Sequence, residues 1–262
     1  RFGLISEKDK IAVAASGGKD SLTVLFLLKK WYSDITAIAV DEGIADYREH
    51  TLRDLEKACK ELDVPLIITS YKELTGFTLD EILKKHKLHA CTICGTFRRH
   101  LISIASKDFD VLATGHNMDD EAQTVLMNII RGNTEIFPRN GPKTGVGAVG
   151  FTQRVKPLYF CTEKEVMTYA FLKGFVTKFT ECPNAKDGYR YNVREALNEY
   201  TRSTPDAKRR ILENFLKLKD LFPKKDVELP TCESCGEPSA KPICKTCEFL
   251  EIVKDPATPV NP

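Results

Sequence analysis

The chain has 262 residues, which suits one sizeable domain with a small appendage at roughly 150 residues per domain. Apolar residues make up 42% and charged residues 29%, and this balance excludes disordered, collagen-like and low-complexity proteins. The net charge is only +2, so any attraction to a polyanion has to come from local clusters of basic residues.

The first half of the chain alternates short apolar runs with stretches of helical periodicity. The apolar runs predict buried strands over residues 10–15, 35–40, 65–70 and 111–115. The spacing of apolar residues predicts helices over 21–28, 47–62, 79–86, 96–106 and 119–131, with Cys91 in a loop. Strands that alternate with helices indicate βαβ units and a parallel sheet covered on both faces. We predict a doubly wound α/β domain.

The second half of the chain is expected to be less regular. A fifth parallel strand is predicted over 174–179, after a long loop over 137–151 that contains four glycines and two prolines. Beyond Tyr189 the pattern becomes helical over 192–200 and 206–221, and prolines then mark a linker. We divide the chain into a catalytic domain, a basic helical extension and a small cysteine module, over residues 1–182, 183–228 and 229–262.

The segment SGGKDS, residues 16–21, stands where the first predicted strand gives way to a helix. Its two glycines allow backbone N–H groups to approach a phosphate, and the helix N-terminus supplies partial positive charge. Lys19 adds a full charge, and Ser16 and Ser21 add hydroxyl donors. The segment matches neither G-x-x-x-x-G-K-[ST] nor G-x-G-x-x-G. We therefore predict an anion-binding loop of a different class.

Polar residues also follow the second and fourth predicted strands. Asp119 and Asp120, in the segment GHNMDD, either cap the next helix or hold magnesium or the reacting substrate. Val40 ends the second strand and either touches an adenine or belongs to the core. The segment Asp41-Glu42-Gly43 after it is a weak candidate for a ribose contact.

Nine cysteines are too few for a disulfide scaffold, and six of them form three C-x-x-C pairs. The chain shows no signal-like segment and no apolar run near the roughly 18 residues that span a bilayer. In such a chain, C-x-x-C pairs indicate metal or redox sites. We expect a cytoplasmic protein with no membrane partner.

Three cysteines of the first 182 residues are candidates for a shared site. Cys91 and Cys94 lie in a basic segment, whose charges are expected to lower thiol pKa values and to favour metal, persulfide or redox chemistry. Cys182 precedes a proline and offers a third thiolate. Three thiolates would leave one iron of a 4Fe–4S cluster open to a ligand such as hydrosulfide. A redox disulfide to Cys182, or three unconnected thiols, is the alternative; Cys59 and Cys161 are predicted to be buried fillers.

The C-terminal cysteines form two C-x-x-C knuckles separated by eight residues: Cys232, Cys235, Cys244 and Cys247. Four thiolates are the ligand set of a closed tetrahedral zinc site. Because so short a segment has little core, zinc is expected to supply its folding free energy.

Residues 186–225 contain eleven Lys and Arg against six Asp and Glu, a local charge of +5. The basic residues include Arg190, Arg194, Arg202, Lys208, Arg209 and Arg210. They form either a solvated helical face or a contact surface for an RNA backbone.

The segments SGGKDS, CTICG, ATGHNMDDEAQT and ECPN, together with the two terminal knuckles, resemble the TtuA/NcsA family of tRNA uridine 2-thiolation enzymes. The resemblance implies a PP-loop fold of the HUP type, tRNA as substrate, and a ubiquitin-like sulfur-carrier protein or inorganic sulfide as sulfur donor. Homodimers are common among its members. Family members also carry an N-terminal zinc finger, for which the sequence shows no cysteine motif before Cys59.

The resemblance also implies roles for individual residues. It places ATP contacts at the glycine loop and at neighbouring positions: Ala14, Ser16, Gly17, Gly18, Lys19, Asp20, Ser21, Val40, Arg98 and Gly115. It places the 4Fe–4S cluster on Cys91, Cys94 and Cys182. Catalytic roles fall to Lys19, Asp120, Cys91 and Cys182.

The implied reaction has two steps. The uridine C2 oxygen attacks the α-phosphate of ATP, and pyrophosphate leaves into the glycine loop, stabilised by Lys19 and Mg²⁺. Sulfur transfer through the cluster then displaces AMP and gives 2-thiouridine. The alternatives are transfer from a cysteine persulfide without a cluster, a non-catalytic ATP- and RNA-binding sulfur-relay scaffold, and a cytidine 2-thiolation or lysidine-type ligase.

Overall fold

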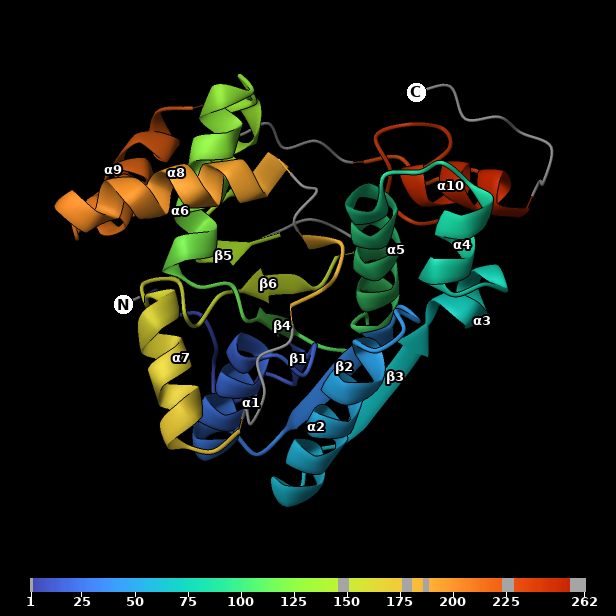
Figure 1. The fold of residues 1–262 in the computed structure, drawn as a ribbon, viewed down its shortest axis with the longest axis horizontal. Helices are drawn as coiled ribbons and strands as arrows, with labels where there is room; N and C mark the ends of the chain where they lie inside the picture. Colours follow the sequence, from blue (N-terminus) through green and yellow to red (C-terminus); the bar gives the residue numbers. More distant parts are fainter. Residues whose placement is uncertain (1, 146–150, 176–180, 186–188, 223–228, 255–262) are drawn as a thin grey trace.

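The computed structural model of the protein describes residues 2–145, 151–175, 181–185, 189–222 and 229–254. Its strands are β1 (Ile11–Ala14), β2 (Ile35–Asp41), β3 (Leu66–Ser70), β4 (Val111–Thr114), β5 (Lys143–Thr144) and β6 (Gln153–Val155). They form one sheet in the order β3-β2-β1-β4-β6-β5 (Figure 1). Five of them pair in parallel, and β5 pairs antiparallel to β6 at the edge.

The helices are α1 (Lys19–Trp31), α2 (Arg48–Glu61), α3 (Tyr71–Thr75), α4 (Leu79–Lys85), α5 (Ala90–Ala105), α6 (Met118–Ile130), α7 (Glu163–Leu172), α8 (Tyr189–Ser203), α9 (Ala207–Leu218) and α10 (Lys245–Lys254). Short 3-10 helices cover Thr134–Arg139 and Lys219–Leu221. None of the helices in the described ranges is long and apolar enough to cross a membrane.

Successive residues of β1 point to opposite faces of the sheet, as the two-residue period of a strand requires. Ile11 and Val13 join the core beneath α1 and α2, whereas Ala12 joins the smaller core beneath α5. All three are fully buried. The prediction of a doubly wound α/β domain is therefore confirmed.

The predicted fifth strand is wrong where the structure describes it. Gly174 lies in a turn and Phe175 outside any strand, while residues 176–180 lie outside the described residues. The ring of Phe175 packs against Phe26 of α1, with centroids 4.1 Å apart. Its apolar character therefore reflects contact with a helix.

The fifth parallel strand is β6, which was not predicted because Gln153 and Arg154 give it no apolar run. Its antiparallel neighbour β5 lies inside the segment 137–151 that was predicted to be a loop. The expected count of five strands is thus corrected to six, of which five are parallel.

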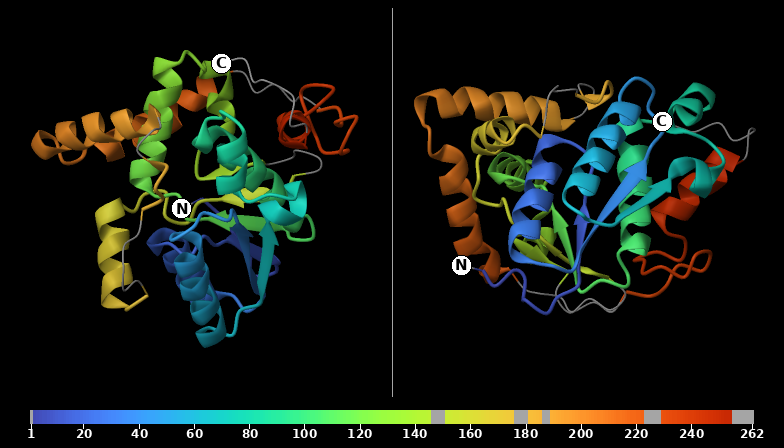
Figure 2. Two further views of the ribbon diagram at one scale, coloured as in Figure 1. Left: turned by 45° about the vertical axis from the view of Figure 1, so that its right-hand side comes forward. Right: turned by 90° about the horizontal axis from the view of Figure 1, so that it is seen from below.

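The C-terminal elements pack on opposite sides of the α/β domain (Figures 1 and 2). Helices α8 and α9 pack on α6, and their shared core includes Leu197, Leu212 and Phe215. Helix α10 packs on α5 and α3 through Phe249 and Val253. Both segments therefore extend cores of the first domain.

Candidate active site

The glycine loop connects the end of β1 to the start of α1, as predicted. The Ser21 hydroxyl closes it, accepting from the Ser16 N–H at 3.1 Å and donating to the Gly18 carbonyl at 3.0 Å. Gly18 is the N-cap of α1 and gives no side-chain cap. The first N–H groups of a helix have no partner within the helix, and without a capping side chain they suit an anion.

Two glycines allow close approach of the backbone around this loop. Gly17 has φ of +80°, and a Cβ there would lie 1.9 Å from the carbonyl oxygen of Thr51 in α2. Gly115 follows β4, and a Cβ there would lie 2.9 Å from the backbone nitrogen of Ser21. The loop is thus packed between α2 and the end of β4, and any larger side chain would displace it.

Lys19 is held by two carboxylates. Its Nζ lies 2.8 Å from Asp20 and 3.0 Å from Glu163 at the start of α7. Burial opposes its charge, but the two carboxylates outweigh this effect and raise the pKa of Lys19. The side chain is therefore a fixed positive charge beside the loop, and Glu163 is a neighbour that the sequence did not indicate.

The segment after β4 meets the glycine loop because the ends of β1 and β4 are in register, with Ala14 opposite Thr114. Asn117 caps α6 and donates from Nδ2 to Asp20 Oδ1 at 3.0 Å. Asp120 accepts from the Asn117 N–H at 3.3 Å and lies 3.8 Å from Arg190. Burial raises the pKa of Asp120, although these two contacts oppose the rise.

The two aspartates of this segment have different surroundings. Asp119 is buried, pairs with Lys208 of α9 and accepts from the Glu163 N–H at 2.8 Å. It therefore joins three helices and has a structural role. The side chain of Asp120 is 36% exposed beside Asn117 and Arg190, so it is the aspartate that a substrate could reach.

The three candidate thiols converge. Cys91 and Cys94 lie on the first turns of α5, and Cys91 Sγ is 3.4 Å from the Asn184 carbonyl, two residues after Cys182. Cys94 and Cys182 pack against the same core cluster. The prediction of a loop at Cys91 is wrong, because Ile93 and Phe97 are buried at helical spacing and start the helix at Ala90.

The environment of the thiols differs from expectation in one respect. Basic neighbours were expected to lower their pKa values, but burial raises the pKa of both Cys94 and Cys182, with Arg98 opposing the rise. The buried Tyr71 hydroxyl donates to the Cys94 carbonyl at 2.6 Å and lies 3.4 Å from its Sγ. Without a bound cation, the surroundings of Cys94 and Cys182 therefore favour the neutral thiol over the thiolate.

A buried ion-pair network links the loop to the thiols, and the sequence analysis missed it. The Glu42 carboxylate lies 2.8 Å from Arg48 and 3.8 Å from Arg98. Arg48 donates to the Ser16 carbonyl at 2.5 Å. Glu42 was a weak candidate for a ribose contact, but its carboxylate is buried between these two arginines. Its only sequence signal is its position directly after β2.

The remaining predicted positions lie around the loop. Val40 is only 3% exposed and packs in the same core cluster as Ile44 and Tyr71, which favours the core alternative. Ala14 ends β1. Cys59 is buried in the core as predicted, whereas Cys161 is only half-buried beside it.

The four C-terminal cysteines form a compact group whose sulfur atoms all lie within 4.8 Å of one another. Cys232 and Cys247 are 3.9 Å apart, and Cys235 and Cys244 are 3.7 Å apart. A tetrahedral zinc ion with Zn–S bonds of about 2.3 Å separates its sulfur ligands by about 3.8 Å. The group therefore fits a metal of this size and geometry.

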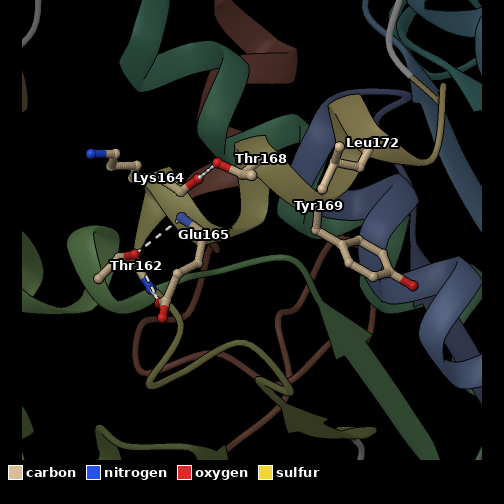
Figure 3. Close-up of a pocket in the computed structure, with 6 residues that line it drawn as sticks. All are labelled: Thr162, Lys164, Glu165, Thr168, Tyr169 and Leu172. Atoms are coloured by element: carbon tan, nitrogen blue, oxygen red, sulfur yellow. Dashed lines mark hydrogen bonds between the residues drawn. The ribbon is translucent and has the colours of Figure 1, made fainter.

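A shallow hollow on α7 lies apart from these groups (Figure 3). It is lined by Thr162, Lys164, Glu165, Thr168, Tyr169 and Leu172. Thr162 and Glu165 are the capping box of α7, as the hydrogen bonds in Figure 3 show. None of the predicted site residues lines it, so we assign it no part in the site.

Comparisons with known proteins agree with this arrangement. A family model described as a PP-loop domain matches residues 4–200. The chain is 36% identical over 259 residues to the tRNA-5-methyluridine(54) 2-sulfurtransferase of Pyrococcus horikoshii, covering 97% of this chain and 83% of that protein. It is 37% identical over 258 residues to the cytoplasmic tRNA 2-thiolation protein 1 of Drosophila melanogaster, covering 95% and 75%.

Among solved structures, the chain is similar to the U34-tRNA thiolase NcsA from Methanococcus maripaludis with its 4Fe–4S cluster. The TM-score is 0.80 at 30% sequence identity, over 96% of this chain and 83% of that one. The similarity extends beyond the PP-loop domain and includes the cysteine-rich C-terminal segment.

Proposed function

Because the chain belongs to the PP-loop family, and within it to the tRNA 2-thiolation enzymes, we propose that it uses ATP to replace the C2 oxygen of a tRNA uridine with sulfur. The observation that carries the proposal is the convergence of Cys91, Cys94 and Cys182 close to an anion-binding glycine loop. The glycine loop would bind the ATP that activates the oxygen, and the thiols would deliver the sulfur. Both steps take place on the same uridine, so the two sites need to be close together.

The glycine loop would hold the phosphates of ATP. Its N–H groups and the Lys19 charge stabilise the pyrophosphate that leaves when the uridine C2 oxygen attacks the α-phosphorus. Lys19 is already held at the loop by Asp20 and Glu163. These two carboxylates are the candidate ligands of a Mg²⁺ ion, which would neutralise phosphate charge.

Asp120 is proposed to accept the uridine N3 proton. Attack through the C2 oxygen makes N3–H more acidic, and a carboxylate whose pKa is raised by burial is a better base than an ordinary aspartate. Asp120 also lies on the same side as the loop, since Asn117 contacts both Asp120 and Asp20.

We propose that the three thiols hold a 4Fe–4S cluster, since Cys91 and Cys94 on α5 converge with the segment of Cys182. Held by three thiolates, the cluster would supply one iron with an open position, a Lewis acid for a sulfur ligand. Arg98, beside Cys94 and Cys182, would attract anionic sulfur. We propose inorganic sulfide or a sulfur-carrier protein as the donor.

The four C-terminal cysteines are proposed to hold a structural Zn²⁺ ion, because their sulfur spacing fits a tetrahedral site. Four arginines of α8 and α9 that are exposed or half-buried are proposed to contact the tRNA backbone: Arg190, Arg194, Arg202 and Arg210. Lys208, which the sequence placed in the same basic group, is buried against Asp119 and is not available to RNA.

The direct test is a reaction of anaerobically purified protein with unmodified tRNA, ATP and sulfide, followed by quantification of 2-thiouridine and AMP. Wild-type protein should form both products in equal amounts. Lys19→Met should lose both, because the loop loses its charge. Cys182→Ala should lose 2-thiouridine and free AMP, because AMP leaves only when sulfur displaces it, while pyrophosphate release, measured in the same reaction, persists. Cys59→Ala, a cysteine buried in the core, should match the wild type.

Other outcomes identify the alternatives. Full activity in iron-free Cys182→Ala would contradict the three-thiolate site, and a persulfide trapped on active, iron-free protein would establish the persulfide route. ATP and RNA binding without AMP formation would establish a scaffold.

A further inference from the structure

Glu42 is a buried carboxylate between two arginines. It follows β2 directly and is 6% exposed. One of its carboxylate oxygens lies 2.8 Å from Arg48 Nε and the other 3.8 Å from Arg98 Nη1. Burying a charge costs several kcal/mol unless it is paired. The two arginines therefore stabilise the buried Glu42 carboxylate.

Arg48 connects Glu42 to the glycine loop. Its side chain is 3% exposed, and Nη1 donates to the Ser16 carbonyl at 2.5 Å and to the Thr51 hydroxyl at 3.0 Å. The backbone of Thr51 is also the nearest neighbour that a Cβ on Gly17 would meet. Arg48 therefore fixes the backbone of the loop and the helix against which the loop packs.

Arg98 connects Glu42 to the thiols. It lies one helical turn after Cys94 on α5, so the two side chains share a helix face. Its side chain is 50% exposed, which leaves part of the guanidinium open to a reactant. Burial lowers its pKa, but Cys94 and Glu42 outweigh burial and raise it.

We propose that Glu42 is a positioning residue that joins the nucleotide site to the sulfur site. Its charge holds Arg48 under the glycine loop and Arg98 between the loop and the thiols, where Arg98 meets the anionic reactants. Two guanidinium groups this close repel each other without a carboxylate between them. The inference rests on the proposed function, since ATP and sulfur are the reactants of that function.

The test compares Glu42→Gln, which keeps the shape and removes the charge, with Glu42→Asp, which keeps the charge at shorter reach. Glu121→Gln is the matched control, because Glu121 is also buried and pairs with Lys156 at 2.7 Å, outside the network of Glu42, Arg48 and Arg98. Each variant is measured for ATP affinity by calorimetry, for kcat and KM of AMP formation with tRNA, and for iron content.

We expect Glu42→Gln to weaken ATP binding about tenfold, because Arg48 and Arg98 lose the carboxylate charge that places them. Glu42→Asp should recover part of this loss, and Glu121→Gln should lower thermal stability while its ATP affinity stays within about twofold of wild type. Iron content should not change, since Glu42 does not bind the cluster.

A double-mutant cycle tests the route through Arg98 and does not depend on the fold of Glu42→Gln alone. If Glu42 acts on kcat by placing Arg98, adding Glu42→Gln to Arg98→Gln should lower kcat no further than Arg98→Gln alone. Fully additive losses of kcat, or ATP affinity in Glu42→Gln equal to wild type, would overturn the inference. Absence of ATP binding in the wild type would instead overturn the proposed function.

Discussion

Gly17 is the residue at which the backbone of the nucleotide site is most tightly constrained. It combines φ of +80° with a contact to Thr51 that leaves no room for a Cβ. Both features follow from packing the loop against α2. Gly17 therefore determines the backbone conformation of the loop. The charged residues around the loop add electrostatic contacts to this conformation.

Gly17→Ala is therefore expected to lose ATP binding and about 2 kcal/mol or more in free energy of unfolding, from backbone strain plus the collision with α2. Gly76→Ala is the control, because Gly76 has nearly the same φ of +84° but open space around a Cβ. Urea denaturation and ATP calorimetry of both variants separate the two effects. Equal losses in the two variants would show that the collision with Thr51 does not matter.

His116 is expected to make the protein sensitive to acid. Desolvation by the surrounding segment and the nearby Lys156 lower the pKa of His116 from 6.5 to about 4, although the residue keeps an exposed face, so its effect on stability is small. Below pH 6.5 the unfolded chain binds a proton that the folded chain does not, so folding stability falls as the pH drops from 6.5 to about 4.

The measurement is the melting temperature between pH 4 and pH 7 for wild type and His116→Gln. The wild-type curve should fall more steeply over this range. Parallel curves would show that His116 titrates normally in the folded protein.

Some residues of the site could be predicted from a short sequence motif, and others depend on contacts between elements. The glycine loop, Asp120 and the C-x-x-C pairs could be predicted, because each is a short motif with its own chemistry. Glu42 and Arg48 could not be assigned their partners, because those contacts depend on how β2, α2 and α5 pack.

At the scale of elements, α6 carries Asp120 of the proposed nucleotide site and is held in place by helices from the C-terminal half of the chain. Asp119 pairs with Lys208 of α9, and Lys208 also donates to Asn198 of α8 at 2.6 Å. The side chains of the Asp119–Lys208 pair are only 10% and 12% exposed. The extension therefore stabilises the start of α6, where Asp120 lies.

Lys208→Met is expected to cost about 3 kcal/mol in free energy of unfolding, because it leaves the Asp119 charge buried without its partner. Arg210→Met is the control, since Arg210 and Asp206 are mostly exposed and such pairs contribute less than about 1 kcal/mol. Urea denaturation measures the free energy of unfolding of both variants. Similar losses would mean that the Asp119 pair is as weak as a surface pair.

Elements were predictable where an apolar pattern was long and regular. The first four strands and most helices between them appear close to their predicted positions, but α3 was not predicted and α5 begins at Ala90 instead of residue 96. The strand β6 has three residues, two of them polar, and it forms because β4 offers an edge for pairing. A strand this short and polar shows no apolar pattern from which it could be predicted.

At the scale of the whole molecule, the cysteine module and the sulfur site share a core. Phe249 of α10 packs edge-to-face on Phe97 of α5, with centroids 6.3 Å apart, and Phe97 packs in the same way on Tyr71. Helix α5 also carries Cys91 and Cys94. Loss of the module is therefore expected to loosen the helix that presents two of the three thiols.

Cys235→Ser should release zinc and shorten the lifetime of bound iron in the presence of a chelator, because α10 no longer supports α5. Cys161→Ser is the control, as Cys161 belongs to neither cysteine group. Metal analysis over time after addition of the chelator gives both rates. Iron that leaves Cys235→Ser and Cys161→Ser at the same rate would contradict the coupling.

We propose that this chain holds two different metal centres, one of which serves sulfur transfer. The most direct measurement is the content of iron, acid-labile sulfide and zinc per chain in anaerobically purified wild type and Cys91→Ala. We expect about four iron, four sulfide and one zinc in the wild type, with iron and sulfide lost and zinc kept in the variant. Zinc alone, in wild-type protein that still forms 2-thiouridine, would contradict it.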